Sequence, residues 1–147
     1  MSVTIRSAST RDLAAVESLL ALLNLPTSGV SEWIDRFWLA EAEGRVIGIA
    51  GIEVYQDGAL LRSVAVDPGW RNQQIARRLT ERAMDAVRAS GNDTVFLLTT
   101  TAEGYFPGLG FERIGRESVP PGVQQSVEFR GACPDSAVVM RRRLLSQ

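Results

Sequence analysis

One stretch constrains the fold of this chain most strongly: VDPGWRNQQIARRLTERAM, from Val66 to Met84. It begins as the end of a strand, continues as a loop with a proline, and then shows apolar residues at helical spacing from Ile75 to Ala89. Gly91 marks the end of this helix, since glycine favours the left-handed conformation that closes helices. The apolar run TVFLLTT follows, which is typical of a strand buried on both faces. The pattern therefore predicts one long helix that links two apolar strands.

The rest of the chain predicts further strands and helices around this unit. A Ser/Thr cap and apolar residues at helical spacing predict a core-facing helix that ends near Leu23, before Pro26. Three β-rich runs separated by Glu-Gly and Asp-Gly turns predict antiparallel hairpins. These runs span 37–43, 45–55 and 59–66. The other expected elements are a strand at 3–6, a short helix at 31–37, a turn or short helix at 102–109, a strand from about Phe111 and a final strand at 137–144.

Composition limits the domain count and the class of protein. With 147 residues, 45% of them apolar, and 16 basic against 17 acidic side chains, the chain fits a single domain spanning 1–147. The net charge of -1 gives no electrostatic reason to propose a nucleic acid or a membrane as partner. We expect a cytoplasmic protein, because the sequence has no long apolar run and no secretion signal.

Cysteine and histidine usage excludes several kinds of site. Cys133 is the only cysteine, and the chain has no histidine. An internal disulfide, the usual zinc ligand sets and the Ser/His or Cys/His catalytic pairs are therefore ruled out, and we expect no metal. Cys133 itself is interpreted as a small buried or loop residue.

Two motifs frame the long helix and the strand after it. Val66-Asp67-Pro68 and Arg71-Asn72-Gln73-Gln74-Ile75-Ala76 occupy the positions of a strand ending in Val-x-Pro and a loop of the form Arg/Gln-x-x-Gly-x-Gly/Ala, with Gln74 at the position of the first glycine. The segment AEGYFPGLGF, from Ala102 to Phe111, has the spacing of Ala-x-x-Phe-Tyr-x-x-x-Gly-Phe, with the two aromatic residues in the opposite order. With these motifs, almost the whole chain resembles the GCN5-related N-acetyltransferase (GNAT) family. The resemblance implies an α/β (α+β) acyl-CoA N-acyltransferase fold, with a mixed central β-sheet and helices on both faces. It also implies transfer of an acetyl group from acetyl-CoA to an amine by direct attack, without a covalent enzyme intermediate.

The first motif is expected to bind the cosubstrate, acetyl-CoA. Backbone N–H groups at a helix start, supported by the helix dipole, bind anions, so the turn into the helix can hold the pyrophosphate. Arginines beside the turn add positive charge, and the preceding strand can offer backbone groups to the pantetheine chain, as in strand addition. The expected cofactor-binding residues are Val64, Val66, Arg71, Asn72, Gln73, Gln74, Ile75, Ala76 and Arg77.

The loop departs from the family pattern at Gln74, which stands where the family has glycine. Glycine lets phosphate oxygens approach the backbone, whereas Gln74 carries a Cβ and a long amide. If Gln74 keeps ordinary helical dihedral angles and points to solvent, the N–H groups stay available and its amide can donate to a phosphate. The alternative is an ordinary helix N-terminus without a ligand.

Two positions are candidates for proton transfer. Many members of the family have a tyrosine five residues before the final Phe of the second motif, where it protonates the leaving thiolate. Here Phe106 occupies that position and Tyr105 precedes it. Tyr105 is therefore the candidate acid, with core packing as the alternative. Glu53, on the strand next to the Val-x-Pro strand, is the candidate general base, and a solvated charge is the alternative for it.

Arg62 bears on the identity of the substrate. Strand alternation puts Arg62 on the same face as Val64 and Val66, just before the cofactor loop. A guanidinium there can form a bidentate fork with a carboxylate, phosphonate or arsonate. The alternative is an internal ion pair with Glu53 or Glu112. The expected substrate-binding residues are Arg62, Ser63 and Arg130.

Three segments are similar to an acetyltransferase subfamily associated with bacterial arsenic-resistance operons: LLRSVAV, TTTAEGYF and FRGACPDSAVVMRRRL. We therefore expect an N-acetyltransferase that acts on a small, anionic amine, either an amino acid or a toxic amino-acid analogue. The rival prediction is a non-catalytic acyl-CoA-binding or interaction module that has kept the fold, because the glycine, tyrosine and carboxylate of the family are displaced or missing. The oligomeric state stays open, with a homodimer as one alternative.

Overall fold

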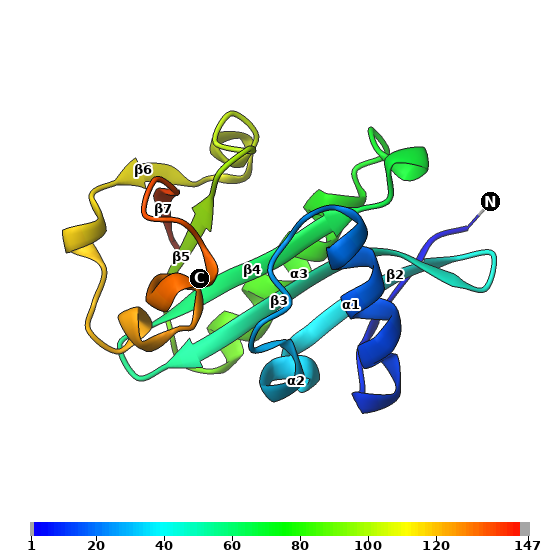
Figure 1. The fold of residues 1–147 in the computed structure, drawn as a ribbon, viewed down its shortest axis with the longest axis horizontal. Coiled ribbons are helices and arrows are strands. Elements are labelled where there is room, and N and C mark those ends of the chain that lie inside the picture. Colours follow the sequence, from blue (N-terminus) through cyan, green and yellow to red (C-terminus); the bar gives the residue numbers. More distant parts are fainter. Residues whose placement is uncertain (1, 145–147) are drawn as a thin grey trace.

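The computed structural model describes residues 2–144, which form one seven-stranded sheet with the order β1-β2-β3-β4-β5-β7-β6 (Figure 1). The strands are β1 (Thr4–Ser7), β2 (Phe37–Ala42), β3 (Arg45–Tyr55), β4 (Gly58–Val66), β5 (Thr94–Thr99), β6 (Glu112–Ile114) and β7 (Val138–Arg143). β4 and β5 pair in parallel, and the other neighbours pair antiparallel. The predicted hairpins and the mixed sheet are confirmed.

Helices cover both faces of this sheet, as predicted. The α-helices are α1 (Leu13–Leu22), α2 (Val30–Trp33) and α3 (Ile75–Ala89). α3 packs on β2, β3 and β4 from one side, whereas α1 and α2 pack on β3 from the other side (Figure 1). Short turns of 3-10 or π-helix connect the elements: η1 (Thr10–Asp12), η2 (Ile34–Arg36), η3 (Pro68–Trp70), η4 (Phe106–Leu109), η5 (Arg116–Ser118), η6 (Val123–Gln125) and η7 (Glu128–Ala132).

The long helix α3 has the bounds that its apolar spacing predicts. Its buried face includes Ile75, Leu79, Ala83 and Val87, which join the apolar cluster between this helix and the sheet. Burial of an aliphatic side chain contributes about 1.5–3 kcal/mol, so this face fixes the helix on the sheet. The start of α3 is therefore held in a constant position relative to the end of β4.

A β-bulge in β4 breaks the alternation that the sequence predicts. Ile49 pairs with Ala65 and Gly51 pairs with Arg62, so two residues of β4 lie opposite one residue of β3. Ser63, inside the bulge, has a φ of 60°, in the left-handed region. Because one extra residue shifts every later side chain to the other face, Arg62 does not share a face with Val64 and Val66. The predicted common face is therefore wrong.

The two faces can be assigned from packing. Val66 and the half-buried Val64 pack in the cluster under α3. Arg62 instead lies on the side of α1 and α2, because a Cβ built on Gly29, just before α2, would lie 3.0 Å from its Nη1. The bulge therefore turns Arg62 away from the α3 side while the next residues keep their contact with α3.

β4 and β5 separate soon after they meet. Their parallel pairing comprises Ala59 with Val95 and Leu60 with Phe96. Beyond Leu60, β4 continues to Val66 beside β3, while β5 pairs with β7 on its other side. The strands therefore diverge at the bulge, and a gap opens in the sheet before the loop that leads to α3.

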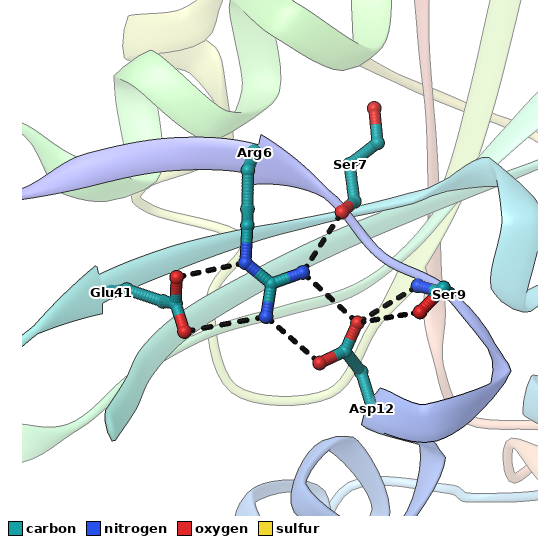
Figure 2. Close-up of polar contacts among 5 residues, drawn as sticks. All are labelled: Arg6, Ser7, Ser9, Asp12 and Glu41. Atoms are coloured by element: carbon teal, nitrogen blue, oxygen red, sulfur yellow. Dashed lines mark hydrogen bonds and ion pairs between the residues drawn. The ribbon is translucent and has the colours of Figure 1, made fainter. Parts of the chain in front are cut away.

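An ion cluster fixes the N-terminal strand at the far edge of the sheet (Figure 2). Arg6 on β1 donates from Nε to Glu41 Oε1 over 2.8 Å and from Nη2 to Asp12 Oδ1 over 2.8 Å. Asp12 Oδ2 also accepts from the backbone N–H of Ser9 over 2.8 Å. The cluster joins β1, η1 and β2.

Candidate active site

A cavity of about 880 Å³ lies where β4 and β5 diverge. Its wall includes the ends of both strands, the loop before α3 and the first turn of α3. Residues 23–26, the segment after β5, Glu128 and the segment 132–134 complete it. It brings together most of the residues that the sequence singles out: Arg62, Ser63, Val64, Val66, Arg71, Asn72, Gln74, Ile75, Ala76, Arg77 and Tyr105. Three of the predicted site residues, Gln73, Glu53 and Arg130, lie outside this wall.

The edge of β4 presents backbone groups to this cavity. The N–H of Asp67 donates to the carbonyl of Ile47 on β3 over 2.8 Å, so the backbone of Asp67 points toward β3. Backbone groups of successive residues point to opposite edges of a strand, and those of Val66 and Val64 therefore point toward the gap. The carbonyl of Val66 accepts from Nε of Arg71 over 3.2 Å. Val64 is the residue whose backbone is left for an extended amide chain.

The loop before α3 adopts a left-handed conformation at Gln74, where the family pattern has glycine. Gln74 has φ 63° and ψ 17°, in the left-handed region, which costs a residue with a Cβ about 1–2 kcal/mol. Gln74 therefore does not keep the ordinary helical dihedral angles that were one of its alternatives. The chain arrives extended at Arg71 and must reverse within a few residues to enter α3, and two left-handed residues, Asn72 with a φ of 66° and Gln74, make this turn. Glycine enters that conformation without the steric cost, which explains the family preference.

The turn leaves its amide groups free. Within residues 2–144, no hydrogen bond engages the backbone N–H groups of Gln74, Ile75 and Ala76. The side chain of Gln74 turns aside, because its Oε1 accepts from Nε of Arg77 over 3.2 Å. Arg77 in turn donates from Nη2 to the carbonyl of Gly108 over 3.1 Å. The N-terminus of α3 is thus an open group of donors beside two arginines, which suits a pyrophosphate.

Arg62 lies between two glutamates. Its Nη1 donates to Glu53 Oε2 over 2.8 Å, and its Nε donates to Ser63 Oγ over 3.1 Å and lies 3.5 Å from Glu128 Oε2. The other oxygen of Glu53 accepts from the hydroxyl of Tyr55 over 2.5 Å. Nη2 of Arg62 is buried and has no hydrogen-bond partner among residues 2–144. Of the two predicted internal partners, Glu53 is confirmed, whereas Glu112 pairs with Arg141.

Burial changes the protonation of this cluster. Burial raises the pKa of Glu128 to about 7, while the charge of Arg62 opposes the rise and that of Glu53 adds to it. Burial also raises the pKa of the Cys133 thiol to about 12, and the nearby Glu128 adds to this rise. Cys133 is half-buried in the cavity wall, so the thiol stays protonated and unreactive there. Glu128 therefore titrates close to neutral pH.

Sequence reasoning missed Glu128. It lies in η7, a π-helical turn with irregular dihedral angles, where no spacing pattern exists to guide a prediction. The signal that could have found it is a single acidic residue between the apolar residues Val127 and Phe129. An acidic side chain in such a setting is more often buried than one in a charged surface run.

The other candidate residues differ in their burial and in their hydrogen bonds. Tyr105 is 45% exposed at the cavity rim and lies edge-to-face on Phe106, which is buried. Its predicted role as acid stays a prediction. Glu53 is fully buried with both oxygens bonded, and its role as base also stays a prediction. Arg130 is exposed outside the cavity wall.

Two further properties concern the described part of the chain. Among residues 2–144, no helix combines the length and apolarity that a bilayer crossing requires. The same residues contain no group of three or more His, Cys, Asp or Glu side chains placed to hold a metal ion.

Similar proteins are known from sequence and from structure. Residues 33–113 match the acetyltransferase (GNAT) domain family. An uncharacterised N-acetyltransferase of Chlorobaculum tepidum is 32% identical over 80% of this chain and 78% of its own length. An amino-acid acetyltransferase of Mycobacterium tuberculosis is 30% identical over 75% of this chain and 68% of its own length.

The fold has a close match among solved structures. N-acetylglutamate synthase from Neisseria gonorrhoeae, complexed with coenzyme A and N-acetyl-glutamate, superposes with a TM-score of 0.85 over 99% of this chain at 22% identity. This chain spans 36% of the length of that protein, so the likeness concerns one part of it. At this level of identity, the match shows that the two share a fold.

Proposed function

Because the chain belongs to the GNAT family of N-acetyltransferases, enzymes that use acetyl-CoA, we propose that it acetylates the amine of a small amino acid or amino-acid analogue that carries a carboxylate. The observation that carries this proposal is Nη2 of Arg62, a guanidinium nitrogen without a partner among residues 2–144. Arg62 belongs to the cavity wall although its side chain has no exposed area, so Nη2 lies behind the surface of the cavity. A buried donor of this kind is costly unless something bonds to it, and a substrate carboxylate would do so.

We expect acetyl-CoA to bind in the cavity in one orientation. Its pyrophosphate would accept from the free N–H groups of Gln74, Ile75 and Ala76, with the side chain of Arg77 beside it. Its pantetheine would lie along the edge of β4 and bond to the backbone of Val64, like an added strand. The thioester would then reach the bulge at Ser63, next to the guanidinium of Arg62.

The proposed reaction is a direct transfer. The neutral amine nitrogen attacks the thioester carbonyl carbon, a C–N bond forms, the C–S bond breaks and the coenzyme A thiolate leaves. The nitrogen loses a proton overall, and the thiolate gains one. Tyr105 at the cavity rim is the candidate donor for the thiolate. No covalent link to the protein is needed, because the thiolate is a good leaving group.

Relatives support an amino acid as the acceptor. One sequence relative is an amino-acid acetyltransferase, and the solved structural neighbour carries N-acetyl-glutamate together with coenzyme A. The segments similar to the arsenic-resistance subfamily extend the candidates to toxic analogues such as arsonates and phosphinates, whose anionic oxygens can also accept from Nη2 of Arg62. A cytoplasmic location and a homodimer stay predictions from the sequence.

Arg62→Lys tests the proposal. With acetyl-CoA and a panel of amino acids, each paired with the amine that lacks its carboxylate, we expect the wild type to release coenzyme A in the presence of at least one amino acid. In Arg62→Lys, the KM for that amino acid should rise about tenfold or more, because Lys lacks the second, separately directed nitrogen that Nη2 offers to the carboxylate while Nη1 bonds to Glu53. The paired neutral amine should be affected far less.

The control is the melting temperature with and without acetyl-CoA, which should rise with the ligand in both proteins through linkage. A lower melting temperature with an unchanged KM would assign Arg62 to stability alone. Binding of acetyl-CoA without turnover of any amine would favour the rival function, a non-catalytic acyl-CoA-binding module.

A further inference from the structure

One buried carboxyl group in the cavity wall lies outside the cofactor-binding loop. Glu128 is 4% exposed and lines the cavity beside Ser63 and Cys133. It comes from η7, which lies between β6 and β7 in sequence and contacts β4 through Arg62. Its carboxyl group is therefore close to the bulge, where the thioester would lie.

The two glutamates around Arg62 are not equivalent. Glu53 is 2.8 Å from Arg62 Nη1 and also accepts from the hydroxyl of Tyr55, so both of its oxygens are committed. Glu128 lies 3.5 Å from Nε of Arg62, which is an ion-pair contact but longer than a typical hydrogen bond. Glu53 also lies outside the cavity wall, whereas Glu128 is part of it. Glu128 is thus the carboxyl group that remains available to a substrate.

We propose that Glu128 accepts the proton that the substrate's ammonium group must lose before its nitrogen can attack the thioester. This inference rests on the function proposed above and assigns a residue to its proton-transfer step. In this arrangement, the substrate carboxylate bonds to Nη2 of Arg62 and the ammonium group faces Glu128.

The protons balance in three steps. The ammonium group transfers one proton to the Glu128 carboxylate, and the neutral amine then attacks the carbonyl carbon. When the C–S bond breaks, the nitrogen loses its second proton and the departing thiolate gains one. Glu128 finally releases its proton to water, and the carboxylate is ready for the next substrate.

The surroundings of Glu128 suit both halves of this cycle. The charged or titratable groups that face it are Arg62, Glu53 and Cys133. Burial and Glu53 make its carboxylate more basic, while Arg62 limits the effect, and its pKa is raised to about 7. An acceptor with a pKa near the working pH takes up a proton readily and also gives it back readily.

The same charges define the substrate class more narrowly. With Glu128 ionised, one arginine lies beside two carboxylates, and a substrate with a second acidic group would add further negative charge. A zwitterion adds one carboxylate for Arg62 and one ammonium group for Glu128, and so keeps the charges matched. The cavity therefore favours an amino acid with an uncharged side chain over an acidic amino acid.

The test is Glu128→Gln, which keeps the size of the side chain and removes its proton affinity. At pH 7, we expect kcat for an amino-acid substrate to fall about a hundredfold, while acetyl-CoA still raises the melting temperature by the wild-type amount. In the wild type, kcat/KM should fall as the pH drops below about 7. In Glu128→Gln, this inflection should disappear, and the residual activity should keep rising with pH as more of the amine loses its proton to solvent.

Glu112→Gln is the matched control, because Glu112 is exposed and pairs with Arg141 away from the cavity. It should retain wild-type kinetics. A Glu128→Gln variant within a few-fold of wild-type kcat would overturn the assignment, as would a wild-type kcat/KM that stays level down to pH 5. The pH profile of the wild type needs no variant, so it tests the assignment even if Glu128→Gln does not fold. A wild type that turns over no amino acid would overturn the proposed function together with this inference.

Discussion

Two arginines in this protein each lie between two carboxylates, with opposite outcomes. Arg6, at the edge of the sheet, bonds to Asp12 and Glu41 through all three of its guanidinium nitrogens (Figure 2). Arg62, in the middle of the sheet, bonds to Glu53 and lies at longer range from Glu128, and its Nη2 has no partner among residues 2–144. The Arg6 side chain is 32% exposed, and that of Arg62 is fully buried.

The pKa values of the carboxyl groups move in opposite directions in the two clusters. At the edge, hydrogen bonds from Arg6 hold the pKa of Asp12 below its ordinary value of 3.8. In the interior, burial raises the pKa of Glu128 from 4.5 to about 7 despite Arg62. The same residue types therefore form a cluster with all its hydrogen bonds made at the edge, where water and matched geometry are available. In the interior, where burial outweighs the single ion pair, they leave a guanidinium nitrogen without a hydrogen bond.

The two clusters should also respond oppositely to pH. Because the pKa of Asp12 is lowered by folding, Asp12 adds stability above pH 3.8, and this stability is lost as the pH falls. Because the pKa of Glu128 is raised, the folded state loses relative stability as the pH rises from 4.5 through about 7. The edge cluster thus supports the fold at neutral pH, whereas the interior cluster costs stability there.

Glu53→Gln should have the largest effect on stability. It leaves the buried guanidinium of Arg62 with Glu128 as its remaining charged partner, and breaking a buried pair costs about 3 kcal/mol. Urea unfolding at neutral pH measures this loss. The control Glu112→Gln, in an exposed pair, should stay within about 0.5 kcal/mol of the wild type. If Glu53→Gln lowers the free energy of unfolding by less than about 1 kcal/mol, the ion pair between Arg62 and Glu53 does not stabilise the fold as expected.

Asp12→Asn should have an intermediate effect. The variant keeps an acceptor for the N–H of Ser9 but loses the charge that Arg6 pairs with, and a partly exposed pair of this kind contributes about 1 kcal/mol. Unfolding measured between pH 2 and 6 should show that the variant loses less stability than the wild type as the pH falls below about 4. Its kinetics should be unchanged, and an altered KM would link the edge cluster to the active site after all.

Gln74→Gly should have the smallest effect on stability. It serves as a reference for the two charged clusters, because Gln74 lines the cavity and carries no charge. Glycine removes the left-handed strain but also gives the unfolded chain more freedom, so we expect a gain of less than about 1 kcal/mol. The Kd for acetyl-CoA should change by less than about threefold, because the amide groups are already open. Titration calorimetry measures it, and a much tighter Kd would show that the Gln74 side chain obstructs the phosphate.

The long helix and the hairpins could be predicted because their signals repeat along the chain. The apolar spacing from Ile75 to Ala89 gives the bounds of α3, and the turns at Glu43-Gly44 and Asp57-Gly58 separate the strands as expected. The cavity also gathers most of the residues predicted for the cofactor. Their roles there stay predictions.

Three features of the site could not be predicted, for a common physical reason. Ser63 in its bulge, Gln74 in its left-handed turn and Glu128 in η7 each depend on a conformation at a single residue. Such a conformation is imposed by the surrounding packing and leaves no periodic trace in the sequence. One extra residue at Ser63 was enough to place Arg62 on the opposite face from the predicted one.

The short contact between β4 and β5 has a consequence for how the molecule unfolds. The sheet consists of an N-terminal part, β1 to β4, and a C-terminal part, β5, β7 and β6. The two parts are joined by two residue pairs, by the apolar cluster under α3 and by a second apolar cluster that includes Leu60 and Phe96. With so few hydrogen bonds across this seam, the C-terminal part should be able to open on its own, before the N-terminal part melts. A ligand that bonds to β4 and fills the gap would join the two parts, so that they unfold together as one cooperative unit. The contact between β4 and β5 would thus govern both the binding of the cosubstrate and the cooperativity of unfolding.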